Sequence, residues 1–148
     1  MKTYKTKMRE FQLKENKTDY QKVKITSAKE AYNALKPLFE EHMTIYESFY
    51  ILFLNQANNT TGFVKISQGG IAGTVVDVKI IAKYCIETLS PAVILAHNHP
   101  SGQLKPSRQD IEITKKLVKA LNFCDTKVLD HLIISENGYY SFAEERML

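Results

Sequence analysis

Long apolar stretches are missing from this sequence. Hydrophobic residues make up 44% of its 148 residues, but no run approaches the roughly 18 apolar residues that a membrane-spanning helix needs. Residues 1–5 are basic and lead into polar sequence, so we expect no secretory signal peptide. Low-complexity tracts are missing too, which argues against a disordered chain. These absences predict a globular cytoplasmic protein that does not associate with membranes.

Cysteine is scarce, and its placement limits the chemistry it can serve. The only two cysteines, Cys85 and Cys124, each lie in an apolar segment. We expect both to be buried free thiols in a reducing compartment. A disulfide bond or metal ligation by these residues is the less favoured alternative.

Positive charge is unevenly distributed along the chain. Residues 1–24 contain eight Lys or Arg and three acidic residues, whereas residues 25–148 contain twelve and thirteen, respectively. The net charge of +4 therefore belongs to a basic N-terminal arm. The chain is long enough for one domain with a real core but too short for two. The arm can bind nucleic acid or an acidic partner, although a solvated arm or an edge strand is the commoner arrangement.

The residues most suited to catalysis lie between positions 96 and 110. His97 and His99 follow a short apolar run that predicts a buried strand, and residues two apart on a strand point to the same side. The Pro and Gly residues that come next favour a loop. Ser107 then predicts the N-cap of a helix, and Asp110 completes a capping box in its first turn. Asp110 can therefore face back towards the two histidines.

Two imidazoles and one carboxylate are the ligand set of a catalytic zinc site, in which a water occupies the fourth position. A structural zinc site would normally be closed by a fourth ligand, usually Cys, and no Cys lies near this cluster. We therefore predict that His97, His99 and Asp110 bind one zinc ion per chain. The alternative is that Ser107 and Asp110 form an ordinary capping box with no part in metal binding.

The same string resembles the signature of a known family. His-x-His-Pro, followed after seven residues by Ser-x-x-Asp, is similar to the zinc motif of JAB/MPN (JAMM) metalloprotease domains. Residues 97–102, His-Asn-His-Pro-Ser-Gly, resemble the RadC branch of that family, as do the strand-like residues 47–55 and 128–134. The resemblance runs from about residue 26 to the C-terminus.

This resemblance implies both a fold and an activity. The fold is α/β, of cytidine-deaminase-like architecture, with a single mixed sheet flanked by helices over residues 25–148. The activity is zinc-dependent hydrolysis of a peptide or isopeptide amide, with Ser107 supporting the oxyanion. RadC proteins usually carry an N-terminal helix-hairpin-helix region, which we expect to be missing because residues 1–24 are too few to form it. The alternative function is a non-catalytic accessory protein in DNA repair or mobile-element biology that binds nucleic acid or a repair partner.

A zinc hydrolase also needs a general base. Glu47 is favoured because it begins an apolar strand that we expect to be central, where an unpaired carboxylate is costly. The resemblance points to the same residue, since the family's acid stands at the head of that strand. The alternative is that Glu47 simply lies at an exposed strand end. Sequence alone leaves five glutamates open as the base: Glu40, Glu41, Glu47, Glu87 and Glu112.

Capping residues and periodicity predict two further helices. Ser27 and Glu30 form a capping box that predicts a helix to about residue 41, in which Pro37 either introduces a kink or ends the helix early. A second helix is expected over residues 77–89, with Asp77 as its cap. Its buried face comprises four residues at helical spacing: Val78, Ile81, Cys85 and Leu89.

Apolar and β-rich runs predict the strands that surround these helices. Residues 46–55 and 63–67 are expected to form a hairpin. The apolar run that leads into His97 forms another strand. Residues 126–135 predict a further strand, which is followed by a turn and a short last strand.

Two other metal-dependent chemistries are excluded. HNH nucleases share the letters His-Asn-His, but their residues are dispersed through a ββα unit rather than contiguous. Zinc nucleobase deaminases need His-x-Glu with Pro-Cys-x-x-Cys, and neither string is present. Among the remaining histidines, His131 is adjacent to Asp130 on a strand, so both cannot line one pocket. We interpret His131 as structural or as a support for a ligand, and His42 as a surface residue.

Overall fold

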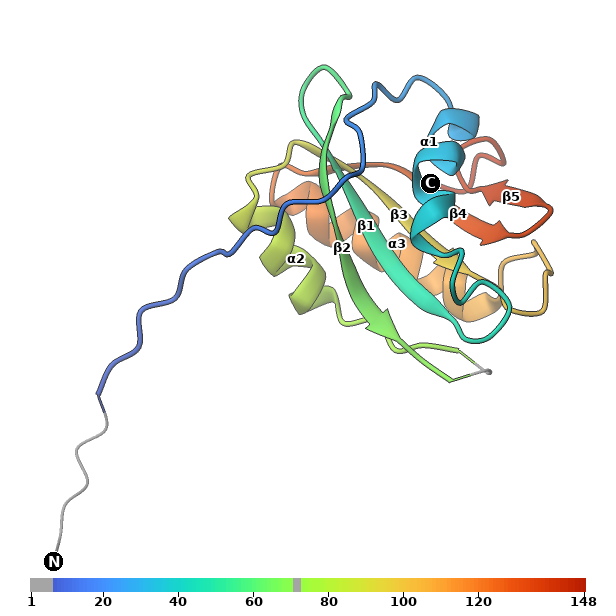
Figure 1. Cartoon of the computed structure of the whole chain (residues 1–148), viewed down its shortest axis with the longest axis horizontal. Coiled ribbons are helices and arrows are strands. Elements are labelled where there is room, and N and C mark those ends of the chain that lie inside the picture. Colours follow the sequence, from blue (N-terminus) through green and yellow to red (C-terminus); the bar gives the residue numbers. More distant parts are fainter. Residues whose placement is uncertain (1–6, 71–72) are drawn as a thin grey trace, which may run out of the picture.

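The centre of the protein is a five-stranded mixed sheet (Figure 1). The computed structural model describes residues 7–70 and 73–148. The strands of these ranges are β1 Ser48–Leu54, β2 Thr60–Gln68, β3 Ala92–Asn98, β4 Lys127–Ser135 and β5 Gly138–Ser141. They lie in the order β2-β1-β3-β4-β5. β3 and β4 are parallel, and the other neighbouring strands are antiparallel.

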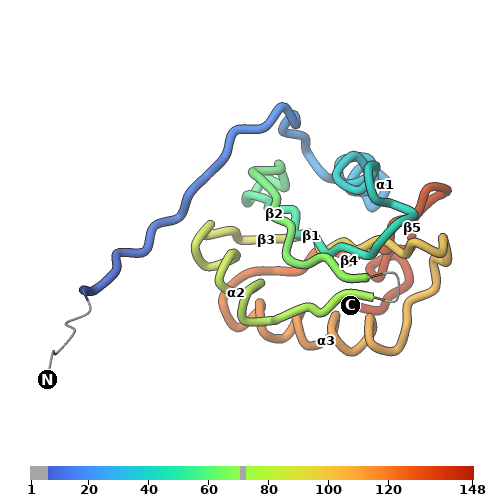
Figure 2. Tube along the Cα trace, turned by 60° about the horizontal axis from the view of Figure 1, so that its bottom comes forward, coloured from blue at the N-terminus to red at the C-terminus, as the bar shows by residue number. Residues whose placement is uncertain are grey.

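Helices cover both faces of this sheet (Figure 2). One face carries α1 (Ala28–Leu35), which continues into a 3₁₀ turn over Lys36–Leu38. The other face carries α2 (Val78–Glu87) and α3 (Arg108–Phe123). The predicted α/β fold, a single mixed sheet flanked by helices, is confirmed. Within the described ranges, no helix combines the length and the apolar character needed to cross a membrane.

Both faces of β3 are buried because its residues alternate between two cores. Ala92, Ile94 and Ala96 pack in the core beneath α1, whereas Val93 and Leu95 pack in the core beneath α2 and α3. All seven residues of the strand are buried. Side chains in the middle of β3 are therefore enclosed by the two cores, and only those at its C-terminal end line a cleft.

Local capping signals predict the starts of the helices correctly. Ser27 and Asp77 are the N-caps of α1 and α2, and each accepts a hydrogen bond from a backbone N–H of the first turn. α1 ends before residue 41 because Pro37 has no N–H to donate and the chain tightens into a 3₁₀ turn. Leu89 is 84% exposed, so its predicted burial is wrong. α2 has ended at this point, and Leu89 adopts a φ of 51°.

Two further predictions about burial are wrong. Cys124 is exposed because it follows the last turn of α3, although Cys85 is buried and both thiols are free. Burial raises the pKa of the Cys85 thiol to about 12, so it stays protonated. His42 is only 5% exposed. Its ring stacks on Tyr46, and its Nε2 lies 2.5 Å from the hydroxyl oxygen of Ser48.

The basic N-terminal arm is exposed over residues 7–24 and is anchored at β2. Val23 N–H donates to Thr60 Oγ1, and Thr60 N–H donates to the carbonyl of Val23, both at 2.8 Å. Tyr20 meets Phe63 edge to face, with ring centroids 5.3 Å apart. Residues 7–19 extend away from the domain (Figure 1).

Asn98 connects the end of β3 to the segment that leads into β1. Its side chain is completely buried. Its Oδ1 accepts from the backbone N–H of Ser48 at 2.9 Å, and its Nδ2 donates to the carbonyls of Met43 and Tyr46, also at 2.9 Å. This one amide therefore holds in place the residues on both sides of Glu47.

We predict that Asn98→Ala lowers the free energy of unfolding by about 2–5 kcal/mol, because several buried backbone groups lose their partners. Equilibrium urea unfolding measures the change. Asn33→Ala is the control at an exposed position of α1, and it should change the free energy of unfolding by no more than about 0.5 kcal/mol. A loss below about 1 kcal/mol for Asn98→Ala would contradict this account of the amide.

Candidate metal centre

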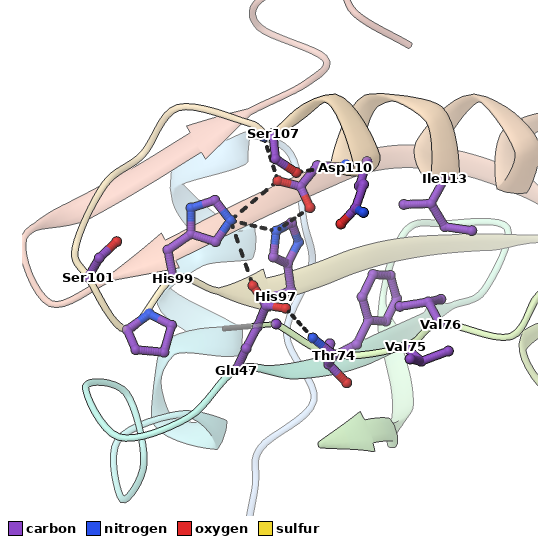
Figure 3. A pocket seen from close by; sticks show the side chains of 14 residues that line it. Glu47, Thr74, Val75, Val76, His97, His99, Ser101, Ser107, Asp110 and Ile113 are labelled. Carbon is purple, nitrogen blue, oxygen red and sulfur yellow. Dashed lines mark hydrogen bonds and ion pairs between the residues drawn. The ribbon is translucent and has the colours of Figure 1, made fainter. Parts of the chain in front are cut away.

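A cleft of about 510 Å³ opens where β3 ends (Figure 3). It is bounded by the end of β3, the first turn of α3 and the residue before β1. The side chains that line it include all five residues singled out by the sequence: Glu47, His97, His99, Ser107 and Asp110. Residues from three separated segments thus meet in one cavity.

His97, His99 and Asp110 form a triangle of potential ligand atoms. The two Nε2 atoms lie 3.1 Å apart. His97 Nε2 lies 3.3 Å from Asp110 Oδ1, and His99 Nε2 lies 3.3 Å from Asp110 Oδ2. A tetrahedral zinc site with bonds of about 2.0–2.1 Å has ligand–ligand edges of about 3.3 Å. The three distances are close to that value, although the two that involve Asp110 end on different oxygens of its carboxylate.

Local structure aims these ligand atoms into the cleft. His99 Nδ1 lies 2.7 Å from the carbonyl oxygen of Gln103. Because a carbonyl only accepts, Nδ1 carries the hydrogen, and in the neutral ring Nε2 presents its lone pair. Asp110 Oδ2 accepts from Ser107 N–H at 2.7 Å, and Ser107 Oγ accepts from Asp110 N–H at 3.1 Å. The predicted capping box is present, and it holds the carboxylate against the histidines.

Glu47, the residue immediately before β1, lines the same cleft. Its Oε2 accepts from Thr74 N–H at 2.7 Å, and its Oε1 lies 3.9 Å from His99 Nε2. Glu47, His97 and His99 each place one potential ligand atom within 4.8 Å of the others. Because 3.9 Å exceeds the edges of the histidine–aspartate triangle, Glu47 stands beside that triangle. Its position suits either a general base or a further ligand.

The other four glutamates that the sequence left open are exposed and do not line the cleft: Glu40, Glu41, Glu87 and Glu112. Glu112 pairs instead with Arg108 at 2.9 Å. Sequence reasoning missed Thr74, which holds Glu47 through its backbone N–H. No side-chain pattern could have indicated that contact.

The electrostatics of the cleft favour a positive charge between these groups. Burial opposes ionisation of Asp110, but the neighbouring His97 and His99 rings outweigh it and hold the pKa of the carboxyl well below its usual range. Burial also opposes the charged form of His99, yet the Asp110 carboxylate and the Gln103 carbonyl raise its pKa overall. The ionised carboxylate and the histidine lone pairs thus converge on a position that a proton or a metal ion can occupy.

A buried histidine lies behind His97. His131 is completely buried; its Nε2 lies 2.8 Å from His97 Nδ1, and its Nδ1 lies 2.6 Å from Thr114 Oγ1. Burial holds the pKa of His131 well below its usual value, so the ring is neutral. The adjacent Asp130 accepts instead from the Ser141 hydroxyl at 2.6 Å. His131 supports His97, as the sequence indicated, whereas Thr114 was missed because it belongs to the apolar stripe of α3.

Comparisons with known proteins define the class to which this sheet and cleft belong. A family model described as a RadC-like JAB domain matches residues 25–147, and this chain belongs to that family. A UPF0758 protein from Flavobacterium johnsoniae is 48% identical over 122 residues, which cover 82% of this chain and 52% of that relative. A UPF0758 protein from Porphyromonas gingivalis is 38% identical over 125 residues, covering 84% and 54%, respectively. The chain spans about half the length of these two curated relatives.

A third relative is found in Escherichia coli. UPF0758 protein YfjY from Escherichia coli is 43% identical over 102 residues, which cover 69% of this chain and 64% of that protein. The similarity therefore extends well beyond the histidine string.

Proposed function

We propose that this protein is a zinc-dependent hydrolase that cleaves peptide or isopeptide amide bonds. The observation that supports this most directly is the triangle of His97, His99 and Asp110 with the Glu47 carboxylate beside it in an open cleft. The resemblance of the same residues to the JAMM metalloprotease motif supports an amide as the substrate. Membership of the RadC-like JAB domain family agrees with both points.

The chemistry of the donor set favours zinc. His97 and His99 would contribute Nε2 and Asp110 a carboxylate oxygen, and catalytic zinc is typically bound by three such groups with the fourth position left open. Zinc held there would act as a Lewis acid and lower the pKa of a water to about 7. The cleft is wide enough at about 510 Å³ for a segment of substrate to reach these residues.

In this proposal, Glu47 transfers the proton that amide hydrolysis requires. Thr74 N–H fixes Oε2, which leaves Oε1 facing the histidines across the cleft. As the oxygen of a water forms its bond with the amide carbon, Glu47 accepts a proton from that water. Glu47 then delivers the proton to the nitrogen as the carbon–nitrogen bond breaks. The carboxylate ends the cycle in its original ionised form.

Ser107 can serve the reaction without giving up its structural role. Its hydroxyl oxygen accepts the hydrogen bond from Asp110 N–H that caps α3. A hydroxyl has two lone pairs and one hydrogen, so its hydrogen remains available for donation. We propose that it is donated to the oxyanion that develops on the substrate carbonyl, which is the usual means of stabilising such charge.

The metal proposal predicts about one zinc ion per chain after reconstitution and dialysis, measured by elemental analysis. Changing His97, His99 or Asp110 to Ala should abolish this binding, because two ligands alone hold zinc weakly. Glu112→Ala removes an exposed carboxylate of the same helix as Asp110, and it should leave zinc content unchanged. Folded wild-type protein that takes up no zinc would refute the proposal.

The base proposal predicts that Glu47→Gln retains zinc but loses most activity. The amide keeps the shape of the carboxylate and cannot accept the proton, so hydrolysis should fall by about 10²- to 10⁴-fold. A screen of peptide and isopeptide substrates with zinc-loaded protein supplies the assay. Glu40→Gln, at an exposed position outside the cleft, is the matched control and should retain full activity.

Different outcomes separate the two roles that the position of Glu47 allows. Loss of zinc together with activity in Glu47→Gln would make Glu47 a ligand, as its distance from His97 and His99 permits. Full turnover of a verified substrate by this variant would place the base elsewhere. His99→Ala should lose zinc and activity together, which provides the reference for failure through metal loss.

A second candidate function is nucleic-acid binding by the basic arm. The arm contains eight of the twenty Lys and Arg residues, and its described part, residues 7–24, is exposed throughout. Exposed lysines on an extended segment can neutralise phosphates without reading sequence. We propose this as a role that accompanies or replaces hydrolysis, as in an accessory protein of DNA repair.

The arm proposal predicts DNA binding that weakens steeply with salt and shows little sequence preference. Deleting residues 1–19 should abolish it, because six basic residues are removed while the contacts of Tyr20 and Val23 with β2 are retained. Fluorescence anisotropy at several salt concentrations measures the binding. The control replaces Lys115 and Lys119 of α3 with Gln and should bind as the wild type does. Tight binding by the deletion variant would assign the site to the domain instead.

A further inference from the structure

A chain of hydrogen bonds runs from His97 into the core behind the cleft. His97 Nδ1 lies 2.8 Å from His131 Nε2, and His131 Nδ1 lies 2.6 Å from Thr114 Oγ1. The Thr114 hydroxyl also donates to the carbonyl of Asp110 at 2.6 Å. His97, His131 and Thr114 are at most 2% exposed, and Phe142 stacks on the His131 ring at 4.9 Å. A lost partner in this chain would therefore be costly.

The number of hydrogens available determines the direction of this chain. Thr114 has one hydroxyl hydrogen, and the carbonyl of Asp110 can only accept. Once Thr114 donates to that carbonyl, its oxygen must accept from His131 Nδ1–H. A neutral His131 then carries its lone pair on Nε2 and accepts from His97 Nδ1–H. His97 is left with its lone pair on Nε2, the atom that lies 3.3 Å from Asp110 Oδ1 in the cleft.

The opposite arrangement leaves one contact without a hydrogen. If Thr114 donated to His131, its oxygen would face the Asp110 carbonyl oxygen at 2.6 Å with nothing between them. His131 would then donate to His97, and His97 would carry its hydrogen on Nε2. Two oxygens repel at a distance typical of a hydrogen bond when no hydrogen joins them. Within the chain from His97 to the Asp110 carbonyl, the first arrangement is therefore favoured, because each of its three contacts has one hydrogen. It leaves the His97 Nε2 lone pair facing Asp110 Oδ1 and His99 Nε2, and a bound cation would join these groups.

We propose that Thr114 and His131 are positioning residues that hold His97 in the tautomer whose Nε2 lone pair can bind a metal ion. This role in metal binding rests on the proposed zinc function. The hydrogen bonds themselves do not require a metal. Thr114 acts on two ligands at once. Its hydroxyl binds the backbone of Asp110 and, through His131, sets the tautomer of His97.

Nitrogen-15 NMR of the metal-free protein, labelled at histidine, measures the tautomer directly. The spectrum is recorded at about pH 8, above the usual histidine pKa of about 6.5. We expect His97 and His131 each to carry the hydrogen on Nδ1 and to have an unprotonated Nε2. A His97 ring that is protonated on Nε2 in the wild type would overturn the proposal.

Variants of Thr114 test the cause of this tautomer. Thr114→Val removes the hydroxyl and keeps the shape, so His97 should populate the other tautomer. Zinc affinity, measured by competition with a chelator, should fall by about 10- to 100-fold. Thr114→Ser should restore both readouts. Thr126→Val is the matched control, because Thr126 is also buried and donates to a carbonyl, that of Ser90, without lining the cleft.

The two readouts separate this proposal from a merely structural role and from the proposed function. Reduced zinc affinity in Thr114→Val with an unchanged His97 tautomer would make Thr114 a structural residue and overturn the proposal. The expected tautomer in a wild type that neither binds zinc nor hydrolyses amides would refute the proposed function alone. If Thr114→Val does not fold, the wild-type spectrum and Thr114→Ser still decide.

Discussion

The antiparallel pairing of β1 with β3 is the constraint on which the site depends. Phe49 pairs with His97, and the same register continued by two residues places Glu47 beside His99. The side chain of Asn98, between the two histidines, accepts from the backbone N–H that follows Glu47, so the continuation is held by a buried hydrogen bond. A slip of one residue would send both histidines to the opposite core. Strand register therefore brings Glu47 and the two histidines to the same end of the sheet.

Asp110 reaches the same position by an independent route. Its backbone and side chain take part in the capping box with Ser107, which is a local interaction. The helix that follows is held against the sheet by Leu117 and Leu121 in the core shared with α2. The histidines come from a strand end and the carboxylate from a helix start. Packing of α3 on the sheet thus decides the distance between the two kinds of ligand.

The parts of this arrangement that follow short-range rules could be predicted from the sequence. The spacing of His97 and His99 indicates one face of a strand, and the capping pattern places a carboxylate in the first turn of a helix. Contacts made by the backbone could not be predicted, since the Thr74 N–H that holds Glu47 has no side-chain signal. The prediction for His42 failed because the chain folds three nearby aromatic residues, Phe39, Tyr46 and Tyr50, around its ring.

The anchoring of the N-terminal arm has a consequence for the outer edge of the sheet. An unpaired strand edge is a template on which another chain can add a strand. Residues 23–25 lie along the turn before β2 and its first residue. Val23 pairs with Thr60, Lys24 bridges to Asn59, and Ile25 N–H donates to the carbonyl of Asn58 at 2.8 Å. A second copy approaching this edge would meet a strand that is already partly paired and a segment of like charge. The arm therefore hinders the addition of another strand at the start of this edge.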